Sequence, residues 1–323
     1  LNMQRALLSG GNGVLTMKSN TKRVEIEGGI FSRRDVARFM LALACAAFVV
    51  SAGRAMADWP GVAVSEDGTP IAYEVWGEGE PTLIFVHGWS CDSRYWREQI
   101  GHFSRKRRVI VLDMAGHGNS GMAREIYTMK AFGEDVRAAA DAAGAQKIIL
   151  IGHSMGGPVI AEAAALMPGR VIGLVGVDTF EDVEYKLTNE EMERMLGPLE
   201  ADFKAGARAF VNSMMRPGED AALNEWILAD MSSAPPTVAM SAIREMLNQY
   251  ITGETASVFD RARIPVLTVN ADMWPINFES NRKHMLSFDA IVLKDADHFL
   301  MMNKPDEFNA ALEKAIDMLM GNQ

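Results

Sequence analysis

The feature that most constrains the fold is the run Lys147–Gly157, where a short apolar stretch leads directly into a serine flanked by glycines. Residues 148–151 are all apolar, which predicts a strand buried on both faces, as in a parallel sheet. Residues 158–165 predict a helix. Ser154 therefore lies on a tight turn that joins a buried strand to a helix.

The residues around this serine favour a nucleophile over an incidental serine in a glycine-rich turn. Gly152 and Gly156 flank Ser154 at two-residue spacing and let the backbone bend sharply without a Cβ clash. The Ser154 hydroxyl is then exposed at the tip of the turn. The Met155 amide, at the start of the helix, points to where an oxyanion would form.

Strands and helices alternate along much of the chain, which predicts a parallel sheet with right-handed crossovers. The expected strands after an opening hairpin of residues 62–64 and 71–76 are 82–86, 109–112, 148–151, 171–177, 265–270 and 290–294. Ligands of such sheets bind beyond the carboxyl ends of the strands. The segment His87–Trp89, Ser154 and Asp178 all fall at that edge.

The pattern changes between Asp178 and Ile264, where no strand is evident and methionine is frequent. Helices are expected over Asn189–Leu196, Glu200–Met215 and Thr237–Tyr250. We interpret residues 181–262 as a helical cap inserted into an α/β core formed by residues 58–180 and 263–323. Most of its methionines are expected to pack between small helices, and some to line an adaptable apolar pocket.

The N-terminal residues 1–57 are expected to lie outside the fold. Arg33 and Arg34 precede the apolar run 39–50, and Ala55-Met56-Ala57 follows it. A basic segment, a short apolar core and an Ala-x-Ala site are typical of a cleaved export signal, here similar to the twin-arginine type although Val36 replaces the usual Phe. The run is too short to span a bilayer, which needs about 20 apolar residues. The sequence thus predicts a periplasmic or secreted protein whose mature chain begins at Asp58.

Charge and cysteine content exclude several classes of protein. Removal of residues 1–57 leaves 24 basic and 39 acidic side chains, a net charge of −15. Binding to nucleic acid or to an anionic membrane is therefore not expected. Only Cys91 remains after cleavage, so the mature chain forms no internal disulfide.

Together these motifs resemble the α/β-hydrolase fold superfamily over residues 60–320. The matching pieces are His87–Trp89, Asp113–Ser120, Gly152–Gly156, and Asp297–Phe299 followed by Pro305. The resemblance implies a mostly parallel eight-stranded sheet flanked by helices, with an inserted cap. It is specific for the fold and much less so for the substrate.

The resemblance also implies roles for individual residues. A serine needs a neighbouring base, and His298 fits because it follows the last strand and precedes the last helix. The backbone amides of Met155 and Trp89 would form the oxyanion hole. Structural or surface positions are expected for the other mature histidines, which are His87, His102, His117, His153 and His284.

In this family a carboxylate orients the histidine and completes a catalytic triad with the serine, and two residues are candidates for it here. The family usually places it three residues beyond the small residue that ends the penultimate strand, but that position is Trp274 here. Asp272 comes two residues too early and could serve only from a distorted loop. The other known position follows the strand after the nucleophile helix and is occupied by Asp178, which we favour, although it could instead only cap that strand.

The expected function is hydrolysis of a carboxylic ester of a small to medium apolar substrate, through an acyl-enzyme on Ser154. No metal or organic cofactor is expected. The same triad could also cleave lactones, amides or carbon–carbon bonds, and a ligand sensor that kept the pocket is a further alternative. Dehalogenase and epoxide-hydrolase reactions are disfavoured because the relatives that catalyse them have Asp at the position of Ser154.

Overall fold

The computed structural model describes residues 23–26, 29–32, 60–217 and 220–321. These belong to two separate units, Leu1–Met56 and Ala57–Gln323. In the first, β1 (Arg23–Ile26) and β2 (Gly29–Ser32) form an antiparallel hairpin. The twin-arginine segment and the predicted cleavage site lie outside the described residues, so the expectation of export stays a prediction. No helix among the described residues has the length and apolar character needed to cross a membrane.

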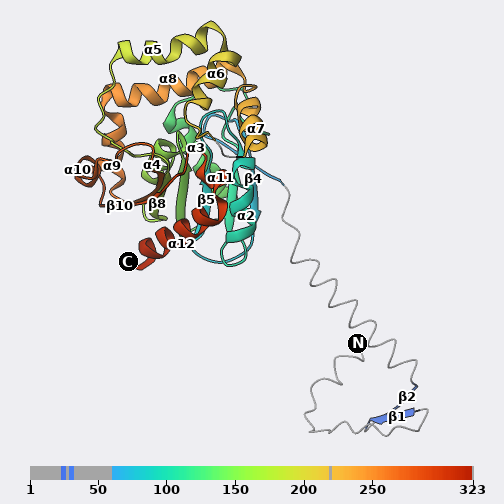
Figure 1. Ribbon diagram of the computed structural model, residues 1–323. Coiled ribbons are helices and arrows are strands. Elements are labelled where there is room, and N and C mark those ends of the chain that lie inside the picture. Colours follow the sequence, from blue (N-terminus) through green and yellow to red (C-terminus); the bar gives the residue numbers. More distant parts are fainter. Residues whose placement is uncertain (1–22, 27–28, 33–59, 218–219, 322–323) are drawn as a thin grey trace. The chain divides into compact units, whose positions relative to one another are not determined.

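The second unit is built on a sheet of eight described strands, which confirms the predicted architecture (Figure 1). Across the sheet the order is β10-β9-β8-β7-β5-β6-β4-β3. Among these strands only β4 runs in the opposite direction, since it pairs antiparallel with both β3 and β6. The bounds are β3 Gly61–Val64, β4 Pro70–Trp76, β5 Thr82–Val86, β6 Val109–Leu112, β7 Ile148–His153, β8 Val171–Val177, β9 Pro265–Ala271 and β10 Ser287–Leu293.

Helices cover both faces of this sheet. Helices α3 (Met129–Ala142) and α4 (Gly156–Leu166) contact one face, and α12 (Pro305–Gly321) contacts the other, beside α2 (Arg97–Phe103). The remaining core elements are η1 (Ser93–Trp96), α10 (Phe278–His284) and α11 (Leu300–Asn303).

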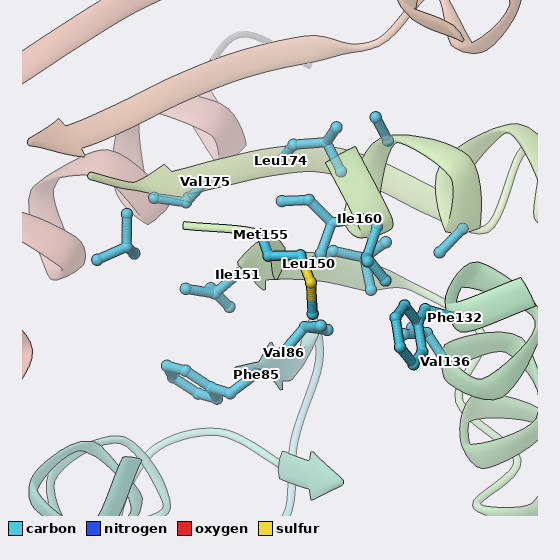
Figure 2. Close-up of a cluster of buried hydrophobic side chains, with 14 of the residues drawn as sticks. Phe85, Val86, Phe132, Val136, Leu150, Ile151, Met155, Ile160, Leu174 and Val175 are labelled. Atoms are coloured by element: carbon cyan, nitrogen blue, oxygen red, sulfur yellow. The ribbon is translucent and has the colours of Figure 1, made fainter. Parts of the chain in front are cut away.

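The core follows from the alternation of side chains along fully buried strands. Val86 and Leu150 lie on the side of Phe132 and Ile160, which come from α3 and α4, whereas Phe85 points to the opposite side (Figure 2). On that side the Phe85 ring packs against Trp96 and Phe103. With both faces covered, the strands are rigid supports for the residues that follow their carboxyl ends.

Five helices lie between β8 and β9, and four of them gather on one side of the second unit in Figure 1. They are α5 (Asn189–Ala201), α6 (Phe203–Asn212), α7 (Ala221–Met231) and α8 (Pro236–Thr252), followed by α9 (Glu254–Ala262), which packs against α4. From here on, the cap means α5–α8 with the segments that join them, which is a part of the predicted cap region 181–262.

Several boundaries differ from the sequence expectations. The expected helix Glu200–Met215 is divided, because Asp202 adopts extended backbone and its side chain accepts a hydrogen bond from the Ala205 amide, which starts α6. Helix α4 begins at Gly156 rather than Pro158. Strand β10 begins at Ser287 rather than Ala290, since pairing with β9 includes Ser287, Phe288 and Asp289 at the edge of the sheet.

Candidate active site

The serine turn is constrained by close backbone packing on both sides. A Cβ atom on Gly152 would lie 2.3 Å from the carbonyl oxygen of Gly156, and a Cβ on Gly156 would lie 2.6 Å from that of Val86. Neither glycine has a positive φ; Ser154 itself does, at 53°. Glycine is therefore needed at both positions because a side chain would clash with the backbone, whereas the residue with the strained backbone conformation is Ser154.

Two backbone hydrogen bonds hold Ser154 in this conformation. Its amide donates to the carbonyl of Val177 on the neighbouring strand at 3.0 Å, and its carbonyl accepts from the Gly157 amide at 2.8 Å. The serine is thus tied to β8 and to the first turn of α4, in the expected position between strand and helix.

The loop after β10 positions His298 next to the serine turn. The Asp297 carboxylate accepts hydrogen bonds from the Phe299 amide and from Asn303 Nδ2, both at 2.9 Å, which fixes the loop internally. The His298 amide donates to the Met214 carbonyl at 3.2 Å, which ties the loop to the segment after α6. His298 and Ser154 line the same two cavities.

Asp178 contacts the imidazole of His298 directly. Its Oδ2 lies 2.6 Å from His298 Nδ1, and its Oδ1 accepts a hydrogen bond from the Ala271 amide at 2.8 Å. The Asp178 side chain is fully buried. A carboxylate so placed holds Nδ1 in the protonated tautomer and leaves Nε2 free to accept a proton.

Asp272 has a different partner. It forms an ion pair with Arg216 at 2.6 Å, and the Asp295 backbone amide, together with Arg216, holds the pKa of its carboxyl below the usual value. No hydrogen bond between Asp272 and His298 is present among the described residues. The structure therefore brings Asp178, and not Asp272, together with the candidate base.

The two candidate oxyanion donors come from different segments: Met155 directly follows the serine, and Trp89 lies in the loop after β5. Neither the Met155 nor the Trp89 amide donates to another described residue. His87 has an unforeseen part in orienting one of them: its Nδ1 donates to the Gly88 carbonyl at 2.9 Å, and its Nε2 accepts from the Met114 amide at 3.0 Å. Because a trans peptide directs its N–H opposite to its C=O, this bond fixes the direction of the Trp89 N–H.

His153 also supports the site, which sequence reasoning missed. Its Nε2 donates to the backbone carbonyl of His298 at 2.8 Å, and the two ring centroids are 4.6 Å apart. Burial, followed by the charge on His298, holds the pKa of His153 well below its usual value, so it stays neutral. Its place directly before the nucleophile, at the end of a buried strand, was the only available signal.

Two cavities of unequal size meet at Ser154 and His298. The larger has a volume of about 850 Å³ and is lined by Ser154, Pro158, Asp178, Thr179, Glu181, Asp182, Tyr185, Met195, Met246, Tyr250, Trp274, Pro275, Ile276, Asn277 and His298. The smaller has about 40 Å³ and is lined by Trp89, Cys91, His153, Ser154, Phe210, Met214, Met231, Ile243, Met246 and His298. Within the part of the chain that the structure describes, no cluster of three His, Cys, Asp or Glu side chains is arranged to hold a metal ion.

The family model of the alpha/beta hydrolase fold matches residues 81–305, and the chain belongs to this family. The chain is 37% identical over 131 residues to the dihydrolipoyllysine-residue acetyltransferase component of an acetoin cleaving system from Pseudomonas putida, which covers 40% of this chain and 35% of that protein. It is 34% identical over 110 residues to a bifunctional esterase/perhydrolase from Acinetobacter calcoaceticus, covering 33% and 40%. The matched regions thus span less than half of these relatives.

Solved structures share the fold over nearly their whole length. A structure described as a putative aryl esterase from Burkholderia cenocepacia superimposes with a TM-score of 0.66 at 23% identity, covering 81% of this chain and 99% of that one. Esterases, haloperoxidases and epoxide hydrolases all occur among the related proteins. The fold and a hydrolase family are therefore shown, and the substrate is not.

Proposed function

We propose that this protein is a serine hydrolase that cleaves a carboxylic ester through an acyl-enzyme on Ser154. The observation that carries the proposal is the buried hydrogen bond between His298 and Asp178, next to a serine with strained backbone at the meeting point of two cavities. Family membership and the esterases among its relatives support it.

In the first half of the reaction, His298 Nε2 takes the hydroxyl proton while Ser154 Oγ attacks the ester carbonyl carbon. Asp178 stabilises the imidazolium that forms. The Met155 and Trp89 amides bind the developing oxyanion, and each such donor contributes roughly 2.7–4 kcal/mol in comparable sites. Collapse of the intermediate breaks the carbon–oxygen bond, and His298 protonates the departing alcohol.

In the second half, His298 removes a proton from water, and the resulting hydroxide attacks the acyl-enzyme. The carboxylic acid is released and Ser154 regains its proton. No redox step or external reductant is involved, so the residues present suffice for the complete cycle.

The two cavities hold different parts of the substrate. The smaller one is apolar and contains Trp89, the residue whose amide would bind the oxyanion, so it suits the acyl group. Its small volume favours acetyl and other short acyl chains. The larger cavity then holds the alcohol.

Labelling with a fluorophosphonate tests the nucleophile, since the probe forms a bond to an activated serine and releases fluoride. We expect labelling of the native protein and none of Ser154→Ala. The matched control is Ser90→Ala, because Ser90 is buried and also has a positive φ, of 54°, yet follows no strand–helix turn. Equal labelling of Ser154→Ala and native protein would reject Ser154.

Turnover of p-nitrophenyl acetate distinguishes the enzyme from a ligand-sensing protein of the same fold. A matched lactone and anilide extend the test to the alternative reactions. Native protein that is labelled by the probe but hydrolyses only the lactone or the amide would keep the nucleophile and overturn the ester assignment.

A further inference from the structure

The larger cavity has a strongly acidic wall. Its described lining residues include three carboxylates, from Asp178, Glu181 and Asp182, and neither Lys nor Arg. The lining also includes the aromatic rings of Tyr185, Tyr250 and Trp274. Carboxylates and aromatic faces both attract cations.

Two of the three carboxylates are already occupied by partners within the protein. Asp178 binds the imidazole and a backbone amide, as described above. Asp182 Oδ1 accepts from the Glu184 amide at 2.9 Å and from Ser280 Oγ at 2.6 Å, and its Oδ2 accepts from Asn277 Nδ2 at 2.9 Å. Asp182 therefore joins its own loop to residues 277 and 280, and both of its carboxylate oxygens already accept hydrogen bonds within the protein.

Glu181 is the carboxylate with free capacity. Its Oε1 accepts a hydrogen bond from Asn270 Nδ2 at 3.2 Å, and no other side chain among the described residues donates to this carboxylate. The backbone at this position is fixed, because the Asn277 amide donates to the Glu181 carbonyl at 2.6 Å. The side chain is half-buried in the cavity wall without a cationic partner.

The electrostatics of the wall agree with this geometry. Burial, followed by the charge on Asp178, raises the pKa of Glu181 to about 7. Burial, followed by the charges of Glu181 and Asp182, raises the pKa of Tyr250, which lines the same cavity. A cation in the cavity would relieve the repulsion between these carboxylates and favour the ionised form of Glu181.

From this arrangement we infer that Glu181, with the rings of Tyr185, Tyr250 and Trp274, binds a cationic group, such as a quaternary ammonium, on the alcohol part of the substrate. The inference rests on the proposed function, because it assigns the larger cavity to the alcohol. It makes Glu181 a specificity-determining residue outside the triad.

Two thioesters of equal shape test whether the protein prefers a cationic over a neutral group in this part of the substrate. Acetylthiocholine carries the ammonium, and 3,3-dimethylbutyl thioacetate replaces its nitrogen by carbon. We expect native protein to favour the cationic ester in kcat/KM by at least about tenfold, and Glu181→Gln to reduce that ratio to within about twofold of unity. Glu190→Gln is the control, since it removes one negative charge from an exposed cap side chain.

The pH dependence of the same ratio gives a second readout. The ratio should rise between pH 6 and 8 in native protein, as Glu181 ionises, and stay flat in Glu181→Gln. The other titratable groups that line the cavity with Glu181 are Asp178, Asp182, Tyr185, Tyr250 and His298. Protonation of His298 slows both esters alike and cancels in the ratio.

Binding measured without turnover separates this inference from the proposed function. Calorimetric titration of Ser154→Ala with tetramethylammonium should show binding, and the additional Glu181→Gln change should weaken it by about tenfold. Equal binding by the two variants, or none, would overturn the cation site whether or not the native protein hydrolyses esters. Cation binding without ester turnover would keep the site and reject the esterase.

Discussion

The sheet edge and the cap contribute different kinds of residue to the same site. From the edge come polar groups that are buried and joined by short hydrogen bonds, above all His298 and Asp178. From the cap come Phe210, Met214 and Ile243, which line the small cavity with apolar side chains. The edge is rigid because both faces of the sheet are covered, whereas cap side chains can change size without disturbing a hydrogen-bond network. The edge should therefore determine the reaction, and the cap its selectivity for the acyl group.

The largest expected effect belongs to the edge. In Asp178→Asn, Oδ1 can still accept from the Ala271 amide, so Nδ2 is turned toward His298 Nδ1 and forces the wrong imidazole tautomer. We expect kcat on a good ester to fall by at least about 100-fold, below the roughly 10⁴-fold of a serine protease because the leaving group is less demanding. Steady-state kinetics on the folded variant, checked by circular dichroism, measures this.

Asp272→Asn is the matched control for that loss. Asp272 is bound to Arg216 at a partly exposed position, so its amide variant should keep kcat within about threefold of native. If Asp272→Asn loses most of its kcat while Asp178→Asn keeps a nearly native kcat, Asp272 and not Asp178 is the acid of the triad.

A smaller effect, on selectivity, is expected from the cap. Phe210 lines the small cavity and packs edge-on against Trp89 at 5.7 Å between ring centroids. Phe210→Ala should enlarge the cavity and raise the ratio of kcat/KM for hexanoate over acetate esters by about tenfold, given the 1–3 kcal/mol that a methylene is worth in such pockets.

Met195→Ala provides the comparison for this change, since Met195 lies in the cap but lines only the larger cavity. It should leave the acyl-length ratio unchanged. An identical shift in both variants would mean that the small cavity does not hold the acyl chain.

The smallest effect is expected at the contact between edge and cap. The indole of Trp89 donates to the Ala239 carbonyl on α8 at 2.7 Å. Trp89→Phe should lower the free energy of unfolding by about 1 kcal/mol and kcat by less than about fivefold, because the backbone amide remains in place. Denaturant titration and ester kinetics give both values.

Trp226→Phe is a suitable control, because the Trp226 indole makes no hydrogen bond with a described residue and stacks on two arginines at the surface. If Trp89→Phe is no less stable than Trp226→Phe, the bond to Ala239 does not hold the cap. A loss of kcat comparable to that of Asp178→Asn would instead place the indole in the reaction.

Sequence analysis favoured Asp178 over Asp272 as the partner of His298 but left both loops open. Counting along the loop after β9 placed Trp274 in the usual acid position and left Asp272 and Asp178 as alternatives. Which carboxylate contacts His298 depends on where each side chain points. Asp178 has a φ of 47°, and its carboxylate reaches His298 Nδ1, whereas the Asp272 carboxylate binds Arg216 instead. Neither a backbone angle at a strand end nor a partner distant in sequence is readable from local pattern.

What the sequence by itself determined is the alternation of strands and helices and the residues on its turns. Four apolar residues before Gly152, and the glycine spacing around Ser154, are enough for the elbow, because strand burial and backbone bending depend on local side chains. The roles of Glu181, His87 and His153 depend instead on groups far along the chain, such as Asn270, Met114 and the His298 carbonyl. Only the tertiary structure decided these, since a polar side chain acquires its hydrogen-bond partners and its pKa from the burial and charges that folding places around it.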